Sequence, residues 1–68
     1  MIQNDDQLEV TLDRIRWFQH QVAQLRRSET NPVNYRASAA GFLAEIDRMQ
    51  REVREFLCAL PMERVSVA

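Results

Sequence analysis

Apolar residues recur at spacings of three and four along two segments of the chain, as they do on one face of an α-helix. In the first segment, two seven-residue series run side by side and predict a helix over about residues 5–27. In the second segment, two further series predict a helix over about residues 35–60. The members of these series that we expect to form the apolar core are Leu8, Ile15, Phe18, Val22, Leu25, Phe42, Ile46, Met49, Val53, Phe56 and Leu60.

Signals at the segment ends agree with this assignment. Asn4 followed by Gln7 resembles a capping box at the start of the first helix. The polar segment 28–34 contains Pro32 and predicts a turn, Asn34 is the expected N-cap of the second helix, and Pro61 is expected to end it. Two long helices joined by a short loop predict an all-α, antiparallel two-helix hairpin. We expect residues 1–68 to form one domain with a short flexible tail at 62–68.

The apolar stripe on the second helix is wider than one opposing helix can cover. Its members spread over about 140° of the helix circumference. A chain of 68 residues with one cysteine also has no internal disulfide to stabilise a small core. The sequence therefore predicts that the hairpin associates with itself, as a four-helix-bundle dimer or as a tetramer.

The first helix carries a second apolar feature on its opposite face. Val10 and Trp17 stand seven residues apart among polar neighbours. Tryptophan is enriched in the energetic centres of protein interfaces. Val10, Trp17, Arg14 and Gln21 are therefore a candidate interface for a partner protein. The alternative, that Trp17 is an exposed aromatic covered by its own arginine neighbours, remains open at this point.

The composition of the chain argues against two classes of binding partner, nucleic acids and membranes. Apolar residues make up 46% of the chain, charged residues 28%, and the formal net charge is −1. Arg14, Arg16, Arg26 and Arg27 are balanced by acids on the same helix, so we expect no nucleic-acid partner. No apolar run reaches the roughly 20 residues that span a bilayer, so we expect no membrane partner. An acidic, polar start and the single cysteine, Cys58, predict a cytoplasmic protein.

Few residues could carry catalysis. His20 and Cys58 are expected on different helices, far apart along the hairpin, and no Glu-x-x-His metal motif occurs. A single glycine, Gly41, excludes the glycine-rich phosphate loops. We therefore predict no enzyme activity, no catalytic residue, no metal and no cofactor. Gly41 lies inside the second helix, where either a close helix crossing or simple tolerance would account for it.

Four stretches suggest a relationship to known proteins. IQNDDQL at 2–8, TLDRI at 11–15, YRA at 35–37 and EIDRMQREV at 45–53 resemble small bacterial helical-hairpin proteins of uncharacterised function. They are also similar to the hairpin that precedes the helix-turn-helix in HigA-like antitoxin regulators. The resemblance implies an intracellular bacterial association module. We expect a non-enzymatic, homo-oligomeric helical protein-interaction module, or alternatively an antitoxin-like or regulatory accessory protein that binds its partner through the Val10/Trp17 face.

Overall fold

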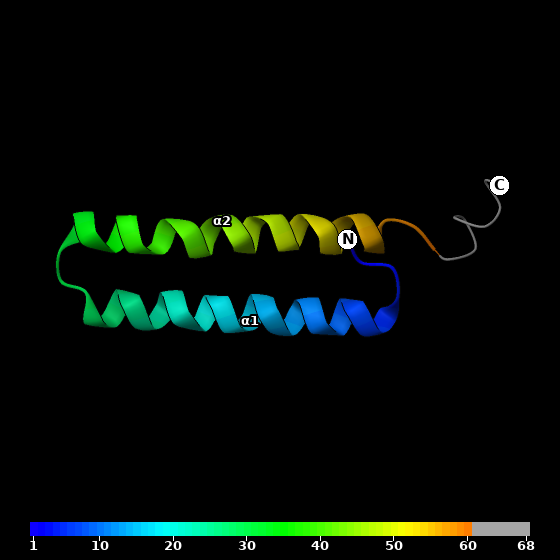
Figure 1. Cartoon of the computed structure of the whole chain (residues 1–68), viewed down its shortest axis with the longest axis horizontal. Coiled ribbons are helices and arrows are strands. Elements are labelled where there is room, and N and C mark those ends of the chain that lie inside the picture. The colour runs from blue at the N-terminus through cyan, green and yellow to red at the C-terminus, as the bar shows by residue number, and fades with distance from the viewer. Residues whose placement is uncertain (61–68) are drawn as a thin grey trace.

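The chain forms two antiparallel helices that lie side by side (Figure 1). The structure is a computed structural model that describes residues 1–60. Its helices are α1, Asp5–Ser28, and α2, Pro32–Leu57, joined by residues 29–31. Residues 1–60 contain no strand, so the predicted all-α hairpin is confirmed for them. The predicted tail at 62–68 lies outside the described residues, and assembly of hairpins into a bundle stays a prediction.

The start of α1 is closed by two side-chain hydrogen bonds. The Asn4 side chain accepts from the Gln7 backbone N–H at 2.8 Å, and the Gln7 side chain accepts from the Gln3 backbone N–H at 2.7 Å. These bonds occupy backbone donors that have no partner within the helix. Asp5 and Asp6 add negative charge at the positive end of the helix dipole. Asn4 is confirmed as the N-cap, whereas the return bond from the Gln7 side chain goes to the N–H of Gln3 rather than to that of Asn4. Helix α1 ends one residue beyond the predicted boundary.

Helix α2 begins earlier than the sequence analysis predicted. Its N-cap is Asn31 rather than Asn34, and Pro32 is its first residue. The Asn31 side chain accepts from the backbone N–H groups of Val33 at 2.9 Å and Asn34 at 3.4 Å. Proline suits the first helical position because its missing N–H would have no partner there and its φ angle is already helical. The predicted start at Tyr35 was therefore one turn too late.

Helix α2 also ends earlier than predicted, at Leu57 with Cys58 as C-cap, rather than at Leu60. The residue before a proline is disfavoured in helical geometry, which applies to Leu60 before Pro61. A proline ring within a helix also clashes with the carbonyl four residues earlier, here that of Leu57. Proline thus limits the helix several residues upstream of itself.

The two helices pack on a small apolar core. Its buried centre is Ile15 on α1 with Ile46 and Met49 on α2. Partly buried apolar side chains pack against this centre: Phe18, Val22 and Val53. Ala39 is buried nearer the loop, and Ile2, from the segment before α1, is 5% exposed at the open end of the hairpin. The core therefore runs along the seam and is closed at one end by the N-terminal segment.

Gly41 does not mark a close helix crossing. It is exposed, and a Cβ built on it would meet no heavy atom within 4 Å. No close crossing within the hairpin therefore accounts for Gly41, and simple tolerance of the glycine fits the structure.

Candidate interaction surfaces

The predicted core stripe is only partly covered by the hairpin itself. Ile15, Ile46 and Met49 are buried, whereas Leu60, beyond the end of α2, is 62% exposed. The remaining predicted core residues are half-buried: Leu8, Phe18, Val22, Leu25, Phe42, Val53 and Phe56. A single hairpin thus brings the stripes of both helices together but leaves much of their side-chain surface in contact with solvent.

Three aromatic rings form a chain across the hairpin. The ring centroids of Phe18 on α1 and Phe42 on α2 lie 5.7 Å apart with an interplanar angle of 49°. Trp17 meets Phe18 edge-on, with centroids 5.1 Å apart and an angle of 69°. Both separations fall in the range of favourable aromatic pairs. Trp17 is thereby held in place on the surface while it stays 56% exposed.

The candidate partner interface on α1 is open to solvent. Val10 is 55% exposed and Trp17 is 56% exposed. Arg14 is exposed and Gln21 is half-buried. Within residues 1–60, no ion pair engages Arg14. The face therefore offers two apolar contacts and a free guanidinium.

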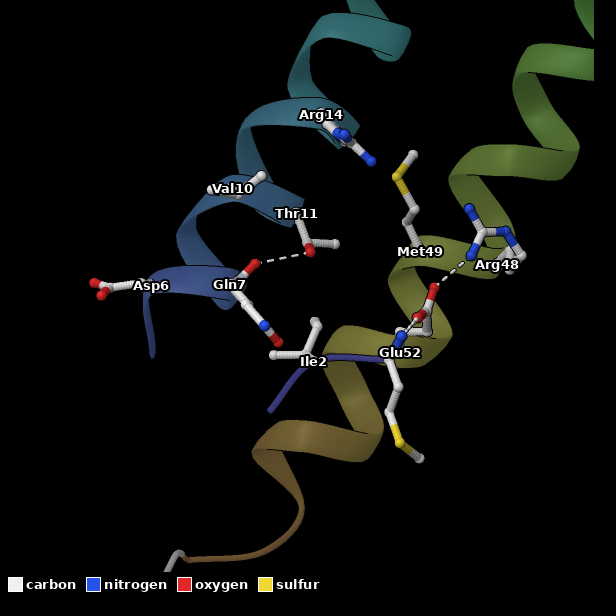
Figure 2. A pocket seen from close by; sticks show the side chains of 10 residues that line it. Ile2, Asp6, Gln7, Val10, Thr11, Arg14, Arg48, Met49 and Glu52 are labelled. Atoms are coloured by element: carbon white, nitrogen blue, oxygen red, sulfur yellow. Dashed lines mark hydrogen bonds and ion pairs between the residues drawn. The ribbon is translucent and has the colours of Figure 1, made fainter. Parts of the chain in front are cut away.

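A groove of about 370 Å³ lies beside this face, between the N-terminal segment, α1 and α2. Its walls include Ile2, Val10, Arg14, Arg48, Met49 and Glu52. Figure 2 shows Ile2 between the side chains of α1 and Glu52 on α2, with Arg14 extending toward Met49. Two residues of the candidate partner interface, Val10 and Arg14, thus border the groove, whereas Trp17 does not line it.

A cluster of charges lines the α2 side of the groove. The Met1 ammonium lies 2.9 Å from one carboxylate oxygen of Glu52, and Arg48 lies 2.7 Å from the other. Arg48 also pairs with Glu45 at 2.8 Å. The spacing of Glu45, Arg48 and Glu52, three and four residues apart on one helix, is the sequence signal that could have predicted these two pairs.

These contacts change the pKa values of the two carboxylates, Glu45 and Glu52. The hydrogen bond from the N-terminal ammonium lowers the pKa of Glu52 below its ordinary value of 4.5, with a smaller contribution from the positive charge of Arg48. Hydrogen bonding to Arg48 likewise lowers the pKa of Glu45. The same pairing raises the pKa of Arg48. The charged groups of the groove wall are therefore paired with one another in ion pairs.

Ile2 is the buried residue that the sequence analysis missed. It precedes α1, outside both periodic series, in a stretch that is otherwise polar. A large aliphatic residue two positions before the N-cap Asn4 was the available signal, because apolar residues just ahead of a helix often pack back on its first turns. Here Ile2 packs farther, reaching the groove between the helices.

The candidate catalytic residues do not meet. His20 is exposed, and its Nε2 lies 3.0 Å from the side-chain nitrogen of Gln24 on the same helix. Cys58 is exposed at the end of α2. Phe18 and Phe42 lie at the same level of the hairpin, so Cys58 stands about 24 Å along α2 from that level. Among residues 1–60, no three histidine, cysteine or acidic side chains are grouped to hold a metal ion.

Neither described helix has a stretch long and apolar enough to cross a membrane. Comparison of the chain with protein-family models, characterised proteins and solved structures found no match. The resemblance to HigA-like hairpins therefore stays a prediction, and function has to be argued from the surfaces themselves.

Proposed function

We propose that this chain is a non-enzymatic helical interaction module that associates with itself. The observation that carries the proposal is the uncovered core stripe. Large apolar side chains of this stripe, such as Phe42 and Phe56, are only half-buried in a single hairpin. A second hairpin laid along the seam would remove that surface from water at a gain of about 25 cal/mol per Å².

The size of the hairpin supports the same proposal. Only Ile2, Ile15, Ala39, Ile46 and Met49 are buried among residues 1–60. A core of this size supplies little net stability against the conformational entropy of ordering two helices. Homo-oligomers of twofold symmetry are the commonest way for such a chain to complete its core. The product is a four-helix-bundle dimer, or a tetramer if a second surface also associates.

Sedimentation equilibrium at micromolar concentration tests this proposal. We expect a mass of two or four times the 8.0 kDa of one chain. Phe42→Asp should abolish association and helicity together, because it places an unpaired charge at the seam. Ala44→Asp, at an exposed site on the same helix, is the control. A helical monomer at all concentrations would contradict the proposal.

A second candidate function is supported by the exposed pair Val10 and Trp17. Their exposure beside a groove that contains the free Arg14 favours a protein partner, as in an antitoxin-like or regulatory accessory protein. Co-purification from the native cell tests it by comparing wild type with Trp17→Ala. We expect the variant to lose the partner while the homo-oligomer keeps its melting temperature. Val33→Ala, at a 68% exposed position near the loop, is the matched control.

A further inference from the structure

Arg14 is the charged group of the groove that lacks a counter-charge. Along the α2 wall, two positive groups and two carboxylates pair with one another: the Met1 ammonium, Arg48, Glu45 and Glu52. The two other charged lining residues belong to α1, and Figure 2 shows Asp6 pointing away from the groove and Arg14 extending toward Met49. Arg14 is exposed and belongs to none of the ion pairs within residues 1–60. The groove therefore presents one uncompensated positive charge.

The neighbours of Arg14 on its own helix do not neutralise it. Residues three, four and seven positions away lie on the same side of a helix. For Arg14 these are all uncharged: Gln7, Val10, Thr11, Trp17, Phe18 and Gln21. The acids nearest in sequence, Asp13 and Glu9, stand about 100° and 140° around α1 from it. Asp13 is also paired with Arg16, at 3.0 Å. The positive charge on this side of α1 is therefore local to Arg14.

Exposed apolar side chains flank Arg14 along the helix axis. Val10 lies about 6 Å before it and Trp17 about 4.5 Å after it, within about 60° of the helix circumference. Both are more than half exposed. The Trp17 ring is already held edge-on against Phe18, so a partner would not have to order it. We call these three residues the Val10–Arg14–Trp17 strip, which runs apolar, positive, apolar over about 10 Å.

This order and length fit a helix of another protein. A helix with apolar residues seven positions apart and an acidic residue between them, three or four positions from each, repeats the same spacing. Its apolar side chains would cover Val10 and Trp17, and its carboxylate would reach Arg14. A small molecule held in the groove would not cover Trp17, because Trp17 does not line the groove. The strip therefore favours an extended protein segment over a small ligand.

We infer that the Val10–Arg14–Trp17 strip, with the groove beside it, binds an amphipathic helix of a partner protein that carries an acidic residue between two apolar ones. Arg14 selects the acidic residue, since its guanidinium can form charge-assisted hydrogen bonds to a carboxylate. This inference rests on the second candidate function and adds to it the chemistry of the partner.

Two matched helical peptides test this inference. Each is an alanine-based peptide of about 20 residues, long enough to populate a helix, with leucines at positions i and i+7. One carries glutamate at position i+4 and the other carries glutamine there. The fluorescence of Trp17, the single tryptophan of the chain, reports binding when neither peptide contains an aromatic residue. We expect the glutamate peptide to bind the wild-type protein about fivefold more tightly than the glutamine peptide.

A pair of arginine variants assigns that preference to Arg14. Arg14→Gln should bind both peptides equally, because it keeps the length of the side chain but removes its charge. Arg26→Gln is the matched control, since Arg26 is an exposed arginine of α1 with no ion pair among those described, about 18 Å farther along the helix. It should retain the preference for glutamate. In the wild type, the preference should shrink at about 1 M salt, which screens charges beyond about 3 Å.

Several results would overturn the inference. They are equal binding of the two peptides to the wild type, an unchanged preference in Arg14→Gln, and no saturable fluorescence change up to about 1 mM peptide. Displacement of the glutamate peptide by an equal concentration of hexanoate would assign the site to small carboxylic acids instead. A native partner that is lost in Trp17→Ala but kept in Arg14→Gln would refute the inference and leave the second candidate function standing. Native-cell purification without any partner would overturn both.

Discussion

Phe18 and Phe42 meet across the hairpin at a ring-centroid separation of 5.7 Å, the one aromatic contact between α1 and α2 within residues 1–60. Phe18 also supports Trp17, which packs edge-on against it. The pair therefore links the internal seam to the exposed candidate interface. It also fixes the level at which the two helices lie opposite each other.

A double-mutant cycle should detect this pair. Phe18→Leu and Phe42→Leu keep the apolar character of each site and remove the ring contact. We expect a coupling free energy of about 0.5–1.5 kcal/mol in the unfolding free energy, measured by urea denaturation at one fixed protein concentration. Fixed concentration is needed because self-association contributes to apparent stability. Strictly additive effects would show that the rings do not interact in solution.

Ile2 should contribute to stability although it precedes α1. Its side chain is 5% exposed, so Ile2→Ala removes buried apolar surface and leaves space between the helices. We expect a loss of about 2 kcal/mol in the unfolding free energy. Val33→Ala, at a 68% exposed site, should change it by less than about 0.5 kcal/mol. Equal effects of the two substitutions would mean that the N-terminal segment does not pack as described.

The pattern of apolar positions predicted both helices, and the short polar segment between them predicted their antiparallel pairing. It did not predict the start of α2, where two asparagines, Asn31 and Asn34, each fit the N-cap. Pro32 was the deciding residue, since proline is favoured just after a cap. Ile2 is buried because the N-terminal segment folds back against the helices. The spacing of apolar residues within a helix does not predict the path of a segment outside it.

Of the candidate surfaces, one could be predicted from the sequence and one could not. Helical spacing was enough to predict that Val10 and Trp17 leave the seam, and both are exposed. The groove beside them could not be predicted, because its walls come from three separate segments. Its charged wall depends on the rotamer of Arg48, which reaches both Glu45 and Glu52. Helical spacing predicts which residues share one face of a helix. A groove forms only where that face packs against other segments, and spacing within one helix does not report this packing.

Acidification should destabilise the fold through the charged wall. The folded-state pKa values of Glu45 and Glu52 lie below the ordinary value of 4.5, which applies in the unfolded chain. Their contribution is therefore fully present above about pH 4.5 and is lost as the pH falls through the lowered values. Thermal melts followed by circular dichroism should show the midpoint falling over this acidic range.

A variant without the Glu52 carboxylate separates the contribution of the ion pairs from general acid denaturation. Glu52→Gln should melt below wild type at about pH 7, and the difference should disappear as the pH falls below the lowered folded-state pKa of Glu52, where both side chains are neutral. Glu55→Gln, which removes an exposed carboxylate without a described ion pair, should show no such convergence. A wild-type advantage that persists in acid would rule out the ion pairs as its source.

Gly41 is a site where stability can be raised. It lies inside α2 with open space around its Cα, so a methyl group would meet nothing. Gly41→Ala should increase the unfolding free energy by about 1 kcal/mol, because alanine loses less backbone entropy in a helix. The reciprocal change at the neighbouring exposed site, Ala40→Gly, should lower it by a similar amount. A destabilising Gly41→Ala would reveal a partner surface packed against that position.

The start of α2 can be tested with its two asparagines. The Asn31 side chain accepts hydrogen bonds from two backbone donors of the first turn, whereas Asn34 lies within the helix and supplies only its backbone N–H there. Asn31→Ala should therefore lower the unfolding free energy by about 1 kcal/mol. Asn34→Ala should be neutral or slightly stabilising, since alanine is the better helix former. If the order of the two effects is reversed in urea denaturation, α2 begins one turn later in solution.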